Sequence, residues 1–167
     1  HEYHSKSITL FDTEGYEVES SSTPENSAFY KNIIDLIDER KNNYPADLGM
    51  HIHEVWYCIN NRFMDLDERL IKDIQARNIP VCVIITKVDN LDENEVAQIK
   101  DAVGDAGKRN RINGVEVFTY STNSDLGDEY VQKSEINSWA HHNLDDYLRE
   151  SFIPSLKKAQ GQMAEMM

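Results

Sequence analysis

The sequence predicts an α/β protein, with a three-layer α/β/α arrangement around a mostly parallel sheet. The first indication is the continuous, β-branched apolar run at 79–85, which is typical of a strand buried on both faces in the middle of a parallel sheet. The second is the alternation of strand-like and helix-like segments, which favours a sheet wrapped by helices on both faces. The third is that short polar motifs follow three of the predicted strands, where open α/β sheets bind ligands.

Four short apolar runs are predicted to be strands, and they lie at 7–11, 54–60, 79–85 and 115–120. The run at 54–60 is predicted to be buried on both faces, like the run at 79–85. Cys58 and Cys82 fall in these two runs, where a free cysteine behaves as a small buried hydrophobe. Neither has a C-x-x-C partner, so we expect a reduced, cytoplasmic setting.

Four helices are predicted from capping residues followed by apolar stripes. The first has Thr23 as its N-cap and Pro24 at its first helical position. The other three are expected to begin at Asp65 or Asp67, within 91–94 and within 143–146. The polar stretch at 121–137 has no clear periodicity and is predicted to be a loop. Trp139 follows it, and this side chain either packs in the core or contacts a partner.

The composition narrows the classes of partner. A formal net charge of −13 argues against broad contact with nucleic acid or with an anionic membrane surface, because both bind surfaces rich in Lys and Arg. The small basic cluster at 108–111 is placed at a predicted helix end, where cations complement the helix dipole. No apolar stretch of 18 residues occurs, so no transmembrane segment is predicted.

The most informative motif is Thr86-Lys87-Val88-Asp89, directly behind the apolar run at 79–85. A Lys and an Asp at the carboxyl end of a buried parallel strand lie where ligands bind. Asp89 can accept two hydrogen bonds from the N–H groups of a purine, and the stem of Lys87 can lie along the base. The motif therefore predicts a purine-binding site.

Two further motifs follow other predicted strands in the same way. Asp12-Thr13-Glu14-Gly15 comes after the strand at 7–11, and Ser121-Thr122-Asn123 comes after the strand at 115–120. An Asp at such a strand end holds Mg²⁺ in phosphoryl-transfer sites, and a following Gly brings its backbone N–H close to a ligand. The three motifs in this order are more specific than any one of them.

This ordered set resembles the GTP-binding domain of translation-factor-like P-loop GTPases, close to their Era-like and septin-like branch. The resemblance covers roughly residues 6–158, and it implies a partial GTP-binding domain at 1–158 followed by a C-terminal tail at 159–167. It implies a P-loop NTPase fold that is incomplete at the amino terminus, with GTP or GDP and Mg²⁺ as cofactors.

The resemblance also assigns roles to individual residues. Asp12 and Gly15 match the D-x-x-G box, which implies contact with Mg²⁺ through Asp12 and sensing of the γ-phosphate by both. The residues that match the guanine box are Thr86, Lys87 and Asp89, and those that match the third box, which contacts guanine O6, are Ser121 and Thr122. Three departures are visible: Thr86 replaces the commoner Asn, Thr122-Asn123 replaces Ala-Lys, and Tyr16 stands where Ras-like members have a glutamine.

The largest departure is that no G-x-x-x-x-G-K-[S/T] pattern occurs in the 167 residues. This loop supplies the backbone N–H groups and the Lys that hold the phosphates. We expect that an amino-terminal portion carrying it precedes this sequence, and that this chain alone is inactive. In the family's sheet that portion carries a strand between the strands at 7–11 and 54–60, so its absence predicts a gap there.

The sequence therefore favours guanine-nucleotide binding and GTP hydrolysis as a molecular switch, with the complete protein a GTPase. The second switch would be the polar loop at 16–23. Expected partners are the nucleotide, and a protein effector or a second copy that meets the nucleotide face. The alternative is a nucleotide-free pseudo-GTPase scaffold that acts as a protein-interaction module. A third possibility is a flavodoxin-like domain that binds another small anion.

Overall fold

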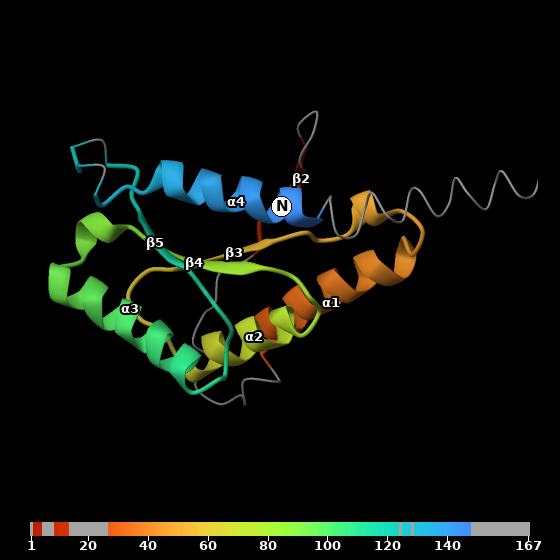
Figure 1. The fold of residues 1–167 in the computed structure, drawn as a ribbon, viewed down its shortest axis with the longest axis horizontal. Coiled ribbons are helices and arrows are strands. Elements are labelled where there is room, and N and C mark those ends of the chain that lie inside the picture. The colour runs from red at the N-terminus through yellow and green to blue at the C-terminus, as the bar shows by residue number, and fades with distance from the viewer. Residues whose placement is uncertain (1, 5–8, 14–26, 124, 128, 148–167) are drawn as a thin grey trace, which may run out of the picture. The chain divides into compact units, whose positions relative to one another are not determined.

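A computed structural model describes residues 2–4, 9–13, 27–123, 125–127 and 129–147. The chain is an α/β protein that divides into two compact units, 1–51 and 52–167 (Figure 1). The first unit contains β1 (Glu2–His4), β2 (Thr9–Phe11), α1 (Ala28–Asn43) and the 3-10 helix η2 (Leu48–Met50). The second contains β3 (Val55–Ile59), α2 (Asp65–Gln75), β4 (Val81–Thr86), the 3-10 helix η3 (Val88–Asn90), α3 (Glu93–Lys108), β5 (Val117–Tyr120) and α4 (Lys133–Tyr147).

The first unit combines a short hairpin with one long helix. Strands β1 and β2 pair antiparallel, and β2 is the carboxyl half of the predicted strand at 7–11. Ser27 is the N-cap of α1, since its Oγ accepts a hydrogen bond from the backbone N–H of Tyr30 at 3.1 Å. The predicted cap, Thr23, lies outside the described residues. The guanidinium of Arg40 lies 4.5 Å from the centre of the Phe11 ring, which links α1 to β2.

The second unit is built on a three-stranded parallel sheet in the order β3-β4-β5. The register places Val55 opposite Val81 and Val83 opposite Val117. Strand β4 is central and its first five residues are buried, which confirms the prediction of a doubly buried strand in a parallel sheet. Strands β1 and β2 form a separate sheet.

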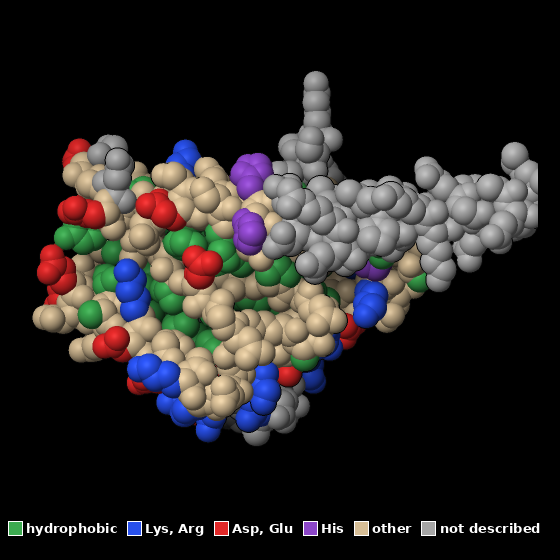
Figure 2. Space-filling view, viewed as in Figure 1, with side chains coloured by type: hydrophobic (Ala, Val, Ile, Leu, Met, Phe, Trp, Pro, Cys, Tyr) green, Lys and Arg blue, Asp and Glu red, His purple; other side chains and the backbone are tan. Residues whose placement is uncertain are grey.

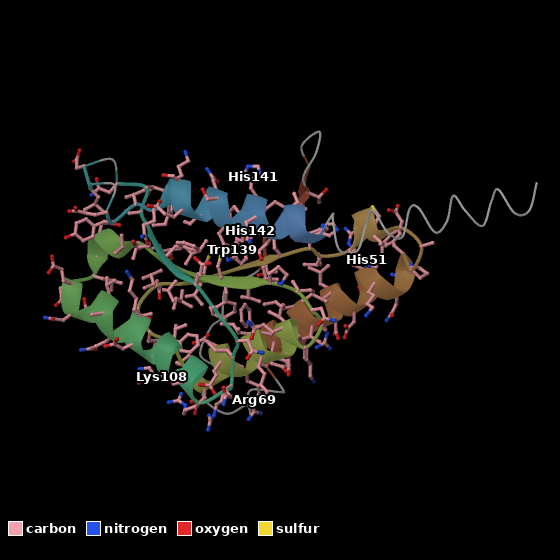
Figure 3. The ribbon with its side chains drawn as sticks, viewed as in Figure 1. His51, Arg69, Lys108, Trp139, His141 and His142 are labelled. Atoms are coloured by element: carbon pink, nitrogen blue, oxygen red, sulfur yellow. The ribbon has the colours of Figure 1, made fainter. Side chains whose placement is uncertain are left out.

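Helices cover both faces of this sheet, in a layering compatible with a three-layer α/β/α fold (Figure 1). Helix α4 covers one face, where Trp139 and Ile136 pack against Cys82, Ile84 and Phe118 (Figure 3). Helices α2 and α3 cover the opposite face of the sheet. Every second residue of β4 points toward this face. The residues buried there are Val83 and Ile85 of β4, Leu70, Ile71 and Ile74 of α2, and Ile99, Val103 and Ala106 of α3.

The prediction that β3 is buried on both faces is wrong. Tyr57 and Ile59 are buried, but Trp56 is 42% exposed and Cys58 is also exposed. Strand β3 is at the edge of the three-stranded sheet, whereas the cluster under α4 is formed by side chains of β4 and β5. An apolar run alone does not distinguish an edge strand with one covered face from a central strand with two.

The predicted loop at 121–137 and the predicted helix start at 143–146 are also wrong, because α4 already begins at Lys133. Ile136, Trp139 and Ala140 have the i, i+3, i+4 spacing of a buried helical stripe, although polar residues surround them. Gln132 fixes the start of this helix, since its side-chain oxygen accepts the backbone N–H of Thr119 at 3.0 Å. None of the helices in the described part of the chain is long and apolar enough to cross a membrane.

Candidate functional site

The candidate site lies where β4 and β5 end, at the carboxyl edge of the parallel sheet. Thr86 is the last residue of β4, and its Oγ1 donates a hydrogen bond to the carbonyl oxygen of Ile59, at the end of β3, at 3.1 Å. Lys87 then turns the chain, and Val88–Asn90 form the short helix η3. The hydroxyl of Thr86 therefore holds the start of this loop against the neighbouring strand.

The backbone of Lys87 is in the left-handed region, with a φ of 55°. Only two other non-glycine residues in the described ranges have a positive φ, and both are asparagines, Asn78 and Asn110. Asparagine tolerates this conformation, whereas a lysine there is uncommon. Backbone outliers of this kind concentrate at ligand-binding and active sites.

The structure brings Asp89 and Ser121 together from two different strand ends. The Oγ of Ser121 donates a hydrogen bond to Oδ1 of Asp89 at 2.5 Å, and it accepts the backbone N–H of Asn123 at 3.0 Å. Ser121 is only 5% exposed, while Asp89 and Thr122 are exposed. Ser121 therefore orients a carboxylate that remains open to solvent.

The other predicted site residues belong to the first unit. Asp12 follows β2 and is exposed. Gly15, Tyr16 and the predicted switch loop at 16–23 lie outside the described residues. In the described part of the chain, no group of three or more His, Cys, Asp or Glu side chains is placed to hold a metal ion.

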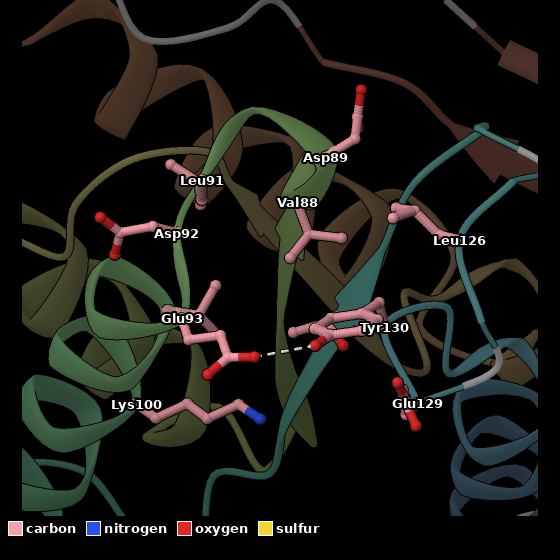
Figure 4. Close-up of a pocket in the computed structure, with 11 residues that line it drawn as sticks. Val88, Asp89, Leu91, Asp92, Glu93, Lys100, Leu126, Glu129 and Tyr130 are labelled. Carbon is pink, nitrogen blue, oxygen red and sulfur yellow. Dashed lines mark hydrogen bonds between the residues drawn. The ribbon is translucent and has the colours of Figure 1, made fainter.

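A pocket of about 530 Å³ lies beside η3, between the first turns of α3 and the residues Leu126, Glu129 and Tyr130 (Figure 4). Its lining includes Val88, Glu93, Lys100 and Tyr130. The hydroxyl of Tyr130 donates a hydrogen bond to Oε1 of Glu93 at 3.1 Å. The carboxylate of Asp89 points away from these three polar side chains, so it is on the outer side of the pocket (Figure 4). We call this cavity the acidic–aromatic pocket.

Sequence reasoning missed the polar residues of this pocket. The sequence predicts Glu93 only as part of a helix start and places Tyr130 in a predicted loop. The hydrogen bond from Tyr130 to Glu93, together with the charges of Glu93 and Glu129, raises the pKa of the Tyr130 hydroxyl. No local sequence signal joins residues that are this far apart in the chain.

A buried carboxylate connects β3 to the start of α2. Asp67 is 6% exposed, and its Oδ1 accepts the hydroxyl of Tyr57 at 2.7 Å while its Oδ2 accepts the backbone N–H of Met64 at 2.6 Å. Burial raises the pKa of Asp67, although both hydrogen bonds and the charge of Arg62 act to lower it. The two hydrogen bonds to Asp67 therefore hold the connection between β3 and α2 in place.

The basic cluster at 108–111 has a more specific role than complementing a helix dipole. Arg109 and Arg111 donate hydrogen bonds to the two carboxylate oxygens of Glu68 on α2, at 3.1 and 3.0 Å. Burial alone would raise the pKa of Glu68, but these two guanidinium groups lower it below its ordinary value. The cluster thus joins the end of α3 to α2.

Comparisons with known proteins do not assign the chain to a group. No protein-family model matches it, and no curated protein matches it either. The site therefore has to be interpreted from its own residues.

Proposed function

We propose that this chain is the greater part of a GTP-binding domain of an Era-like or septin-like GTPase, with a P-loop NTPase fold. In this proposal the loop at 86–89 selects guanine, and the protein uses GTP hydrolysis as a molecular switch. The observation that carries the proposal is the contact between Asp89 and Ser121 at the carboxyl edge of the sheet. It joins two of the three motifs on which the resemblance depends.

The geometry of this loop suits recognition of a guanine base. Guanine presents an N–H and an NH₂ group on one edge, and a carboxylate with two oxygens can accept from both. Asp89 is exposed, and its hydrogen bond from Ser121 limits how the carboxylate can rotate. The long apolar stem of Lys87 can lie against the face of the base.

Fewer observations support the part of the proposal that concerns the phosphates. Asp12 would help to hold Mg²⁺, and Gly15 would contact the γ-phosphate, as the resemblance implies. Bound Mg²⁺ would neutralise charge that develops on the phosphates, and water would attack in line with the leaving group. The 167 residues contain no phosphate-cradling loop, so we expect the isolated chain to bind nucleotide weakly.

The test is the substitution Asp89→Asn in the protein that carries this chain, with Mg²⁺ present. The amide keeps one oxygen as an acceptor, but its NH₂ group faces a guanine donor in place of the second oxygen, so GTP binding should weaken by about ten- to a hundredfold. Binding of xanthosine triphosphate should improve, because an amide can donate to the xanthine carbonyl oxygen. Fluorescent nucleotide titration measures both constants.

Asp101→Asn provides the matched control, since Asp101 is an exposed acid on α3. It removes the same charge and should leave both constants within about twofold. If Asp89→Asn keeps the original preference for GTP, the guanine assignment is wrong.

The second candidate function is a nucleotide-free scaffold that retains the GTPase architecture for protein contacts. A scaffold needs no phosphate-holding loop, and the 167 residues contain no G-x-x-x-x-G-K-[S/T] pattern. The same titration separates the two proposals, because a scaffold shows no saturable GTP binding with Mg²⁺ in any variant.

A further inference from the structure

We propose that the acidic–aromatic pocket binds an arginine side chain and a flanking apolar residue, both presented by a protein partner. The proposal does not depend on nucleotide binding, since the carboxylate of Asp89 points out of the pocket (Figure 4). It rests on the size, apolar lining, charge and aromatic content of the cavity.

The pocket has an apolar interior large enough for more than one side chain. Val88 is 4% exposed, and Leu91, Val96 and Leu126 are half-buried around it. A volume of about 530 Å³ is within the roughly 300–1,000 Å³ range of pockets that bind ligands. An apolar lining suits the methylene stem of a long basic side chain as well as an aliphatic neighbour.

The charge of the pocket indicates the sign of its ligand. Two acidic lining residues, Glu93 and Glu129, lie close to Tyr130, whereas the carboxylates of Asp89 and Asp92 point away from it (Figure 4), and one lining residue, Lys100, is basic. Acidic side chains gather on the left side of the view in Figure 2, with a basic side chain among them, and most other Lys and Arg side chains lie along its lower edge. The field at the pocket therefore attracts a cation.

The aromatic ring favours a guanidinium over other cations. The hydroxyl of Tyr130 is held by Glu93 at 3.1 Å, so the ring and the carboxylate are fixed next to each other. A planar guanidinium can stack on the Tyr130 ring while it donates hydrogen bonds to Glu93 and Glu129. A carboxylate accepts several hydrogen bonds, so Glu93 can bind both Tyr130 and the ligand.

Lys100 should affect binding of the ligand in the opposite direction to Glu93. Its ammonium points toward the same space as Glu93 (Figure 4), so it opposes an incoming cation. Removing it should therefore strengthen binding, whereas removing Glu93 should weaken it. A pocket that serves only to pack the protein would show neither effect.

The experiment is a titration of the ¹⁵N-labelled chain with the peptide acetyl-Leu-Arg-Leu-amide, followed by NMR. Saturable shifts are expected at the amides of Val88, Val96 and Tyr130, with a Kd on the order of 1 mM. The same peptide with citrulline in place of arginine has equal shape without charge. It should bind at least about fivefold more weakly.

Three variants complete the test. Glu93→Gln should weaken peptide binding by about three- to tenfold, and Lys100→Gln should strengthen it by about two- to fivefold. Asp101→Asn removes an exposed acid from the same helix outside the pocket, and should change the Kd by less than about twofold.

Several results would overturn the proposal. The first is binding that does not saturate by about 20 mM peptide, and the second is a set of shifts confined to residues outside the pocket. The third is a citrulline peptide that binds as tightly as the arginine peptide, and the fourth is a Glu93→Gln variant whose Kd changes no more than that of Asp101→Asn. Agmatine, a small guanidinium compound without a peptide backbone, is the last probe. If it binds as tightly as the peptide, the occupant is a small cation and not a protein partner.

Discussion

The hydrogen bond between Tyr57 and Asp67 gives a sharp test of how β3 is joined to α2. Tyr57→Phe removes one hydroxyl and leaves the ring in place. The hydroxyl is 2.7 Å from a carboxylate oxygen of a residue that is 6% exposed, so water cannot easily replace it. A hydrogen bond to a charged group contributes about 1.5–3 kcal/mol, so we expect a loss of about 2 kcal/mol in the free energy of unfolding at pH 7.

Urea denaturation followed by tryptophan fluorescence measures this loss, because both tryptophans are in the second unit. With an m-value of about 2 kcal/mol/M, the midpoint should fall by about 1 M urea. Tyr130→Phe makes the same chemical change at a hydroxyl bonded to the exposed Glu93, and should leave the midpoint nearly unchanged. Equal shifts for the two variants would refute the reasoning.

The effect of Tyr57→Phe should also depend on pH. Because burial raises the pKa of Asp67, ionisation of this group opposes folding. Protonated Asp67 contributes fully to stability at a pH below the ordinary pKa of an aspartate. This contribution is lost as the pH rises through the raised pKa of Asp67 in the folded protein. The Tyr57 hydroxyl offsets part of that loss, so the difference between the two proteins should be largest at neutral pH and shrink on acidification. A constant difference from pH 4 to 7 would contradict this.

Two further predictions concern the face of the sheet under α4. Trp139→Ala should cost about 3–5 kcal/mol in the free energy of unfolding, because Trp139 is 9% exposed and packs on the sheet, whereas Trp56→Ala should cost much less, because Trp56 is 42% exposed. Denaturation followed by circular dichroism compares them, and similar losses would contradict the assigned packing. Cys58 should react with iodoacetamide in the native protein, while Cys82 should react only after unfolding, since it is buried and burial raises the pKa of its thiol. Mass spectrometry of the labelled chain checks this, and equal labelling rates would show that Cys82 is accessible.

The central part of the fold was predictable because its signals are local. The run at 79–85 is β-branched and continuous, and β4 was found there. Asp92 and Glu95 form a reciprocal capping box, which fixed the start of α3 where the sequence indicated. Both features depend on residues within a few positions of one another.

Features that depend on tertiary contacts were missed. The sequence does not show that one face of β3 is left uncovered, so the exposure of Trp56 was not foreseen. Helix α4 is polar over most of its surface, and its start is stabilised by the contact of Gln132 with Thr119 on β5. In the candidate site, the motif at 86–89 was recognisable, whereas the left-handed backbone at Lys87 was not.

The register of the three-stranded sheet has a consequence for how the chain reaches its native state. Val55 lies opposite Val81 and Val83 lies opposite Val117, so every pairing joins segments that are distant in sequence, and no tight hairpin can nucleate this sheet. Topologies of this kind fold slowly, because long loops must close before the pairings stabilise them. During synthesis the Val-Ile run of β4 emerges well before β5, and in that interval it is a site for self-association that chaperones would need to protect.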